Sequence, residues 1–352
     1  MVARIVRDDE VAGSSPVIPT ILFLKFTASS FGEAFFGTRI IFLELNDLKK
    51  FLIAVSGLML VFIVSGDFIG NYFVDFALKR TDNQPPPATA NIADPNLKAP
   101  ARPNFDGEIG EIKSTDGLTL HATYFLPKNA SHKWAILVHG YGRDQTFAFD
   151  YAEEYLKHGY NVLTPDLRAA GTSEGVYLTM GMFESHDVKL WAEKILEKDS
   201  EAKIIMHGVS MGAATVLMAS ALDIKNLCAV VEDCGYTSAY EMFSAQLQVI
   251  FGLPSFPIMN FVDVVSNKKI GCHVSAAAPI NSVPNTKIPT LFIHGTEDKL
   301  VPFEMMERLY NASNAPIKEK FVVEGAGHAD SKKNNPPKYF ERVFNFIDKF
   351  TN

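Results

Sequence analysis

The chain has 352 residues, of which 47% are hydrophobic and 21% are charged, a composition that can build at least one large folded domain. Lys and Arg total 33 against 40 Asp and Glu, so the net charge is −7, and the basic residues form no dense cluster. A nucleic-acid partner is therefore not expected, because binding the phosphate backbone requires concentrated positive charge.

Residues 1–44 do not resemble part of a folded domain. Within them, residues 11–20 read VAGSSPVIPT, and Gly-Ser-Ser-Pro is the in-frame translation of GGTTCGAGTCCC, the T-arm consensus of transfer-RNA genes. We hypothesise that the start has been assigned too early and that translation begins near Leu45 or Leu48, through an alternative start codon. Residues 1–44 are therefore left out of the fold prediction.

Residues 45–81 predict a membrane anchor. Lys49 and Lys50 precede an uncharged apolar run over 51–66, which is slightly short of the ~20 residues of a spanning helix but long for a signal-peptide core. The basic residues favour a cytoplasmic amino end. Because no A-x-A cleavage site follows, we expect a retained single-pass anchor in the cell membrane, with the rest of the chain extracytoplasmic. Secretion after cleavage and a buried helix of the soluble domain are the alternatives.

A Pro-rich segment and a folded body follow the anchor. Residues 82–103 are rich in Pro, Ala and Asn, which is typical of an extended spacer that would hold a domain off a membrane. In residues 104–352, helical patterns such as 149–159 and 183–198 alternate with the strand-like runs LTLHATYFLP, WAILVHG, GYNVLTPD, AKIIMHG, LCAVVEDCG, IPTLFIHG and IKEKFVVEG. This alternation predicts an α/β domain whose mostly parallel sheet has helices on both faces.

One of these runs leads into a serine between two glycines. Residues 204–215, IIMHGVSMGAAT, match G-x-S-x-G between a strand and a helix, with Ser210 at the turn. The glycines let the strand and the helix approach closely, which exposes the serine Oγ at the carboxyl end of the strand. A serine hydroxyl is a weak nucleophile and needs a base, which is itself oriented by an acid.

Two later loops supply that base and acid in the required chain order of Ser, acid, His. Asp298 follows a late strand in LFIHGTEDKLVP, and His328 follows the last strand in KFVVEGAGHAD. Functional side chains of open α/β sheets lie beyond the carboxyl ends of the strands, so these loops should meet at Ser210. Asp233, in VVEDCG, is the alternative acid, and Glu297 is a weaker candidate.

Attack by the serine would also require two backbone donors for the tetrahedral oxyanion. We expect the first to be the N–H of Met211, at the start of the helix that follows the serine. We expect the second to be the N–H of Tyr141 in the loop HGYGRD, where Gly140 and Gly142 would keep the backbone close to the site.

Several polar residues at strand ends have a structural interpretation. His139, His207 and His294 each precede a glycine, but they lie on separate strands without a carboxylate-rich spacing, so no metal site is predicted. We expect His139 and His207 to hydrogen-bond loops near the site. Asp166 and Arg168, in TPDLRAAGTSEG, are interpreted as an ion pair that orders a loop; the alternative is that Arg168 binds a substrate carboxylate.

Together these residues resemble the α/β-hydrolase superfamily over roughly residues 104–352. The matching pieces, HGYG, PDLRAAGTSEG, GVSMG, HGTEDKLVP and GAGH, stand in the family's order and spacing. Within the superfamily the chain is similar to bacterial membrane-anchored members related to serine aminopeptidases and monoglyceride-lipase-like esterases. The resemblance implies Ser210 as nucleophile, Asp298 as acid and His328 as base. It leaves the substrate open, because this fold hosts many functions.

The family inserts a cap between two of its strands, and here the corresponding segment, 237–284, is short. We predict two short helices with an apolar inner face and a substrate pocket lined by Phe243, Phe251, Phe256, Met259 and Phe261. The segment offers no acidic cluster for the free amino group of a peptide, which favours an ester over an aminopeptidase substrate.

The leading hypothesis is a serine hydrolase that cleaves a small-molecule ester or short acyl substrate through an acyl-enzyme, without metal or cofactor. A serine peptidase or aminopeptidase and an acyltransferase would use the same residues. A non-catalytic, membrane-tethered binding protein on an inactivated fold is a third interpretation, and the intact set of residues argues against it. The sequence does not decide the oligomeric state.

The start hypothesis makes a direct prediction. Amino-terminal sequencing of the natural protein should give a first residue near Leu45 or Leu48. A peptide from residues 5–25 in that protein would disprove the hypothesis.

Overall fold

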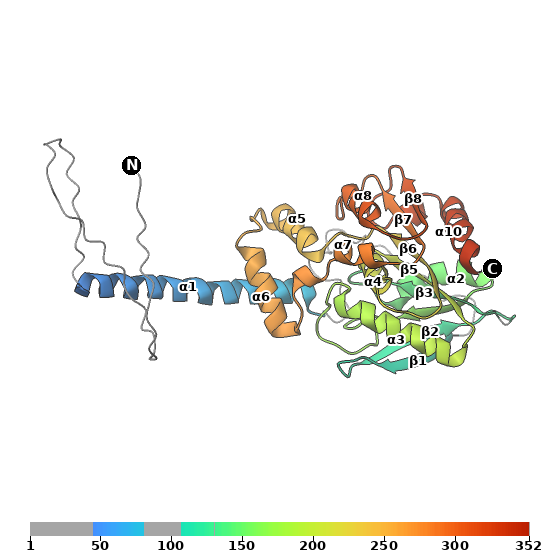
Figure 1. Ribbon diagram of the computed structural model, residues 1–352, viewed down its shortest axis with the longest axis horizontal. Coiled ribbons are helices and arrows are strands. Elements are labelled where there is room, and N and C mark those ends of the chain that lie inside the picture. Colours follow the sequence, from blue (N-terminus) through green and yellow to red (C-terminus); the bar gives the residue numbers. More distant parts are fainter. Residues whose placement is uncertain (1–44, 81–106, 130, 352) are drawn as a thin grey trace, which may run out of the picture. The chain divides into compact units, whose positions relative to one another are not determined.

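The computed structural model describes residues 45–80, 107–129 and 131–351, so the predictions for residues 1–44 and 82–103 lie outside the described residues. The chain divides into two units, Met1–Ala54 and Val55–Asn352. The described part of the first unit, residues 45–54, is the helical start of α1 (Leu45–Leu78). The second unit contains the remainder of α1 and the folded body (Figure 1).

The body is built on an eight-stranded sheet in the order β1-β2-β4-β3-β5-β6-β7-β8. The strands are β1 (Gly107–Lys113), β2 (Thr119–Phe125), β3 (Lys133–Val138), β4 (Asn161–Pro165), β5 (Lys203–Val209), β6 (Leu227–Asp233), β7 (Thr290–Gly295) and β8 (Lys318–Val323). The β1–β2 and β2–β4 pairs are antiparallel and all other neighbours are parallel. The predicted α/β fold is confirmed. The sequence reading missed β1, whose residues GEIGEIK combine glycines with charges at an exposed edge of the sheet.

Helices cover both faces of the sheet (Figure 1). Alternate residues of β5 enter opposite faces, Ile204 into a cluster with α3 and α4 and Ile205 into one with α2 and α10. The helices of the body are α2 (Phe149–Lys157), α3 (Met182–Lys198), α4 (Met211–Ala219), α5 (Ala239–Phe251), α6 (Ile258–Ile270), α7 (Pro279–Ser282), α8 (Phe303–Ala312), α9 (Ser331–Asn334) and α10 (Pro336–Thr351), with short 3₁₀ turns η1 (Gln145–Ala148), η2 (Val274–Ala276) and η3 (Val283–Asn285). Helices α5 and α6 occupy the segment between β6 and β7 where the two cap helices were predicted.

Helix α1 has two different environments along its length. Side chains over residues 46–65 are exposed, and Asn46–Leu78 is long and apolar enough to cross a membrane. Val74 and Leu78, in contrast, are buried in the same cluster as α3 and α4, and the Leu178 N–H donates to the Leu78 carbonyl at 2.8 Å. The last turns of α1 therefore contact the body directly.

Arg168 is buried and binds two carboxylates. Its guanidinium donates to Asp187 at 2.7 and 2.9 Å and to Asp116 at 2.9 and 3.1 Å. Asp166 instead accepts hydrogen bonds from the backbone and side chain of Gln145, at 2.8 and 2.9 Å. The predicted pair of Asp166 with Arg168 is wrong. With both carboxylates in place, Arg168 is also not available to bind a substrate carboxylate.

Replacing Arg168 by Met should lower the free energy of unfolding by roughly 3–5 kcal/mol, because it leaves the buried carboxylate of Asp187 without its partner. The matched control is Arg308→Met. Its pair with Glu241 is solvent-exposed and should contribute less than about 1 kcal/mol. Urea unfolding of the detergent-solubilised protein, followed by circular dichroism, measures both, and equal effects would contradict the structural role of Arg168.

Candidate active site

Ser210 lies at the turn from β5 into α4, with φ 58° and ψ −118°. This positive φ is uncommon for a residue with a side chain. Neither flanking glycine has room for one: a Cβ on Gly208 would lie 2.1 Å from the Gly212 carbonyl oxygen, and a Cβ on Gly212 would lie 2.2 Å from that of Val138. The turn is thus sterically closed to any other residue at these two positions, and the backbone strain falls on Ser210.

Ser210, His328 and Asp298 form a continuous chain of hydrogen bonds. His328 Nε2 is 2.8 Å from Ser210 Oγ, and His328 Nδ1 is 2.7 Å from Asp298 Oδ2. When Nδ1 donates to the carboxylate, Nε2 presents a lone pair to the serine hydroxyl. The Asp298 side chain is fully buried, whereas that of His328 keeps 13% exposure. The structure therefore brings together the three side chains singled out in the sequence, in an arrangement suited to proton transfer.

Asp298 is held by more than His328. Its Oδ1 accepts from the backbone N–H groups of Leu300 and Val301 at 2.9 and 2.8 Å, and its Oδ2 lies 3.3 Å from His294 Nε2. Burial opposes ionisation, but the hydrogen bonds from His294 and His328 outweigh it and hold the pKa of Asp298 well below its usual range. The carboxylate is therefore ionised and fixed in one orientation beside the imidazole.

Asp233, the alternative acid, has other partners. It accepts hydrogen bonds from Ser331 Oγ and from the Tyr339 hydroxyl, both at 2.9 Å, and it is fully buried. Burial raises the pKa of Asp233 to about 6. Among the described residues it forms no hydrogen bond with His328, so the geometry favours Asp298 as the carboxylate that orients the imidazole.

Met211 and Tyr141, the expected oxyanion donors, both line the cavity at Ser210. Met211 is the first residue of α4, where N–H groups lack acceptors within the helix. The loop that carries Tyr141 passes close to the serine, since a Cβ on Gly140 would lie 3.2 Å from the Ser210 Cβ. The Tyr141 hydroxyl donates to the Ala77 carbonyl of α1, which fixes this loop against the end of that helix.

An apolar cavity opens beside Ser210, and its empty volume, which includes space open to solvent, is about 430 Å³. Of the predicted pocket residues, Phe243 lines it. The sequence reading missed six other lining residues: Met180, Tyr236, Met242, Gln246, Leu300 and Val301. The sequence did offer signals for four of them: Leu300 and Val301 closely follow Asp298, and Met242 and Gln246 lie beside Phe243 on α5. Met180, in contrast, comes from a distant segment that only the tertiary fold brings to the site.

The other four predicted pocket residues lie elsewhere. Phe251 and Met259 line a neighbouring cavity, and Phe256 is 76% exposed. The Phe261 ring packs against α1, with its centroid 5.1 Å from that of Phe62. These four residues do not line the cavity at Ser210, because the cap helices pack against α1 as well as against the sheet.

The histidines at strand ends have different surroundings. His139 Nε2 accepts from the Leu167 N–H at 3.1 Å, so this side chain does hydrogen-bond a loop near the site. His207 is buried and lies within 2.9 and 3.0 Å of the hydroxyls of Tyr155 and Tyr339, from helices α2 and α10. The expectation of a loop contact for His207 is wrong, because its side chain lies between the sheet and these two helices.

Cys234, Asp298 and His328 place possible metal-ligand atoms within 4.8 Å of one another. Asp298 and His328 are already hydrogen-bonded to each other. Burial raises the pKa of the Cys234 thiol well above its ordinary value, whereas a metal binds the thiolate. The chemistry of these three groups therefore fits proton transfer better than metal coordination.

Comparisons with known proteins agree with this geometry. The X-Pro dipeptidyl-peptidase (S15) family profile matches residues 116–259. Protein YqkD of Bacillus subtilis (strain 168) is 25% identical over 303 residues, which cover 86% of this chain and 98% of YqkD. The structure of the Pyrococcus furiosus esterase Pf2001 is 27% identical with a TM-score of 0.59, over 70% of this chain and 92% of the esterase.

The Pyrococcus horikoshii acylaminoacyl peptidase shares the fold, at 16% identity and a TM-score of 0.52, over 69% of this chain and 41% of the peptidase. The sheet order, the turn at Ser210 and these similarities lead to one conclusion. The chain belongs to the α/β-hydrolase superfamily, and it is a hydrolase.

Glu232, at the end of β6, is a buried acid close to this site. Its Oε2 accepts from the Gly235 N–H at 3.0 Å. Its Oε1 and the Nδ1 of His294 are both buried without a hydrogen-bond partner among the described residues. Burial raises the pKa of Glu232 to about 8. The folded protein therefore holds a proton on Glu232 at neutral pH.

This raised pKa gives stability a defined pH dependence. The folded state binds the Glu232 proton more tightly than the unfolded state does. The contribution of Glu232 to the free energy of unfolding therefore falls as the pH rises from 4.5, the ordinary pKa of a glutamate, to about 8. Glu232→Gln keeps the side chain neutral, so relative to wild type it should be more stable at pH 8 than at pH 5. The control Glu297→Gln changes an exposed residue. Unfolding at both pH values measures this, and a Glu232→Gln effect that is the same at pH 5 and pH 8 would contradict it.

Proposed function

We propose that the protein is a serine hydrolase that cleaves a carboxylic ester, with Ser210 as nucleophile, His328 as base and Asp298 as the acid that orients the base. The hydrogen-bond chain from Ser210 Oγ through the imidazole to the buried carboxylate carries this proposal. The similarity to the Pyrococcus furiosus esterase supports an ester as substrate.

In the first half-reaction, His328 Nε2 takes the hydroxyl proton of Ser210 while Oγ attacks the ester carbonyl carbon. The imidazolium that forms directs its Nδ1 proton to the ionised Asp298, which stabilises the positive charge. The N–H groups of Met211 and Tyr141 would stabilise the oxyanion. Collapse of the intermediate breaks the bond to the leaving alcohol, which takes the proton from Nε2 and leaves the acyl group on Oγ.

In the second half-reaction, water gives a proton to His328 Nε2 as its oxygen attacks the acyl carbon. Collapse releases the carboxylic acid and returns the proton to Ser210. The apolar cavity beside Ser210, with Met180 and Met242 in its wall, would hold the hydrocarbon part of the substrate. The groups named here supply every proton transfer of the cycle, so we propose that no cofactor takes part.

A serine peptidase or aminopeptidase is the second candidate, and the match to a dipeptidyl-peptidase family over residues 116–259 supports it. We favour the ester because, in the part of the chain that the structure describes, no residue lining the cavity at Ser210 is a carboxylate that could bind a free amino group. Aminoacyl-arylamides tested beside aryl esters separate these two candidates, and added alcohols test an acyltransferase. The complete hydrogen-bond chain argues against a non-catalytic binding protein.

We also propose that α1 is a single-pass anchor that places the body on the extracytoplasmic side of the cell membrane, with secretion as the alternative. The length of the apolar helix and the exposed Lys49 and Lys50 at its start support this orientation. A reporter enzyme fused to the carboxyl terminus, active only outside the cytoplasm, tests it.

The proposal predicts that a fluorophosphonate probe labels the protein and that Ser210→Ala abolishes both labelling and hydrolysis of p-nitrophenyl acetate. Asp298→Asn should lower kcat by about 10⁴-fold while the fold is kept, because the imidazole loses its orienting carboxylate. The matched control is Asp233→Asn, which should cost less than about tenfold because the Asp233 side chain hydrogen-bonds Ser331 and Tyr339 instead of a reacting group. A folded wild type that is not labelled, or equal losses in the two Asp variants, would contradict the proposal.

A further inference from the structure

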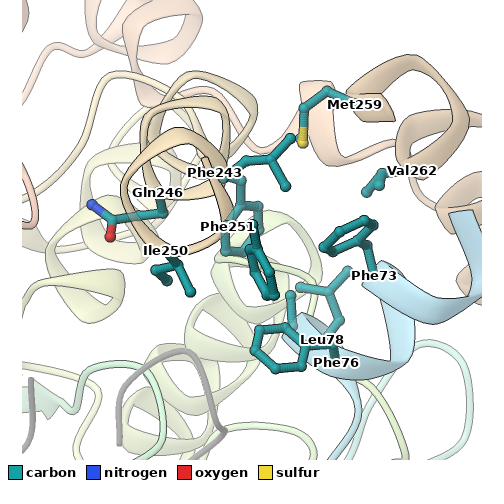
Figure 2. A pocket seen from close by; sticks show the side chains of 11 residues that line it. Phe73, Phe76, Leu78, Phe243, Gln246, Ile250, Phe251, Met259 and Val262 are labelled. Atoms are coloured by element: carbon teal, nitrogen blue, oxygen red, sulfur yellow. The ribbon is translucent and has the colours of Figure 1, made fainter. Parts of the chain in front are cut away.

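A second apolar cavity lies beside the one at Ser210, between the last turns of α1 and the cap helices α5 and α6 (Figure 2). Its empty volume, which includes space open to solvent, is about 460 Å³. Three helices contribute its walls, among them Phe73, Phe76 and Ala77 of α1, Ile250 and Phe251 of α5, and Val262 of α6. Because α1, a helix that could span a membrane, forms one of these walls, a ligand bound in this cavity could bear on the function.

The two cavities are neighbours with a shared wall. Phe243 and Gln246, one turn apart on α5, line both of them. The Gln246 amide donates to the Leu300 carbonyl at 3.3 Å, and Leu300 lines only the cavity at Ser210. The polar end of Gln246 is therefore turned toward Leu300 in the wall of the cavity at Ser210, and Phe243 forms the apolar part of the boundary.

The lining of the second cavity selects a hydrocarbon ligand. Among the described residues that line it, Gln246 has the only polar side chain and none carries a charge. The Phe251 ring packs edge-on against Phe73 and Phe76, with centroids 5.3 and 5.4 Å apart, which joins α5 to α1. A polar or charged occupant would lose its hydration here without replacement, whereas an alkyl chain would gain apolar contacts.

Two ion pairs join α1 to α6 beside the second cavity. Lys268 of α6 pairs with Asp67 at 3.1 Å, and Lys269 pairs with Asp75 at 2.5 Å. Charged side chains are costly inside the hydrocarbon of a membrane, and Asp67 and Asp75 follow the uncharged run over 51–66 on the same helix. Phe73 and Phe76, which line the second cavity, therefore lie on α1 beyond the stretch that would contact lipid.

We propose that the second cavity binds the long acyl chain of a membrane-lipid ester whose carbonyl group lies at Ser210. This inference rests on the proposed function and names its substrate class: a long-chain acyl ester taken from the lipid beside α1. Displacement of the Phe243 ring joins the two cavities into one acyl path. Helix α1 then serves both as an anchor and as a wall of the substrate site.

The test compares hydrolysis of p-nitrophenyl laurate and p-nitrophenyl acetate by the full chain in mixed micelles. Val262 lines the cavity and is 4% exposed, so Val262→Phe should fill it and lower kcat/KM for laurate by about tenfold or more, with acetate unchanged, because several buried methylenes lose their contacts. The matched control is Val264→Phe. Val264 lies on the same helix, is 62% exposed and lies outside the lining, so both esters should be cleaved as by wild type.

A second variant and a binding measurement keep the test independent of folding and of catalysis. Ala77→Phe fills the cavity from α1 instead of α6. It is used in place of Val262→Phe where the Val262 variant does not fold. Binding of cis-parinaric acid, a fluorescent long-chain fatty acid, to the full-length Ser210→Ala protein reports on the cavity without turnover.

A selective loss of laurate hydrolysis and of fatty-acid binding in the filled variants supports the inference. An unchanged laurate-to-acetate ratio together with unchanged fatty-acid binding overturns it. Acetate hydrolysis that survives Ser210→Ala would instead refute the proposed function, and the binding measurement would still decide whether the cavity takes an acyl chain.

Discussion

The turn between β5 and α4 is the constraint on which the site depends. Gly208 and Gly212 approach neighbouring backbone so closely that a Cβ at either would overlap a carbonyl oxygen, and Ser210 between them takes a left-handed backbone conformation. This geometry keeps the serine Oγ beyond the carboxyl end of β5, at 2.8 Å from His328 Nε2. The base in turn depends on Asp298, whose buried charge is stabilised by two histidines and two backbone N–H groups.

The end of α1 is structurally part of the body. Its carbonyl groups accept from Leu178 and from the hydroxyl of Tyr141, a residue next to the serine, and its aromatic side chains pack against α5. The helix that is apolar enough for a membrane therefore contacts both the cap and the loop beside Ser210. These contacts are the physical basis of the proposal that the substrate comes from lipid beside α1.

The elements and the site turn could be predicted because their signals are local. Neighbouring residues are enough to recognise a serine between two glycines after an apolar run. The same holds for an acid and a histidine that follow late strands. The partners of Arg168 and the lining of the cavities could not be predicted, because Asp187, Met180 and Phe73 meet their neighbours only in the folded chain. The edge strand β1 was missed since its exposed side chains carry no hydrophobic pattern.

The proposed mechanism requires that the hydroxyl of Ser210 attacks the substrate and carries its acyl group. Rapid acid quenching of the full chain during turnover of a p-nitrophenyl ester, followed by peptide mass spectrometry, locates that group. The account predicts one added acyl mass on the peptide that contains Ser210. Turnover with an unmodified Ser210, or with the acyl group on another nucleophile such as the Cys234 thiol, would contradict it.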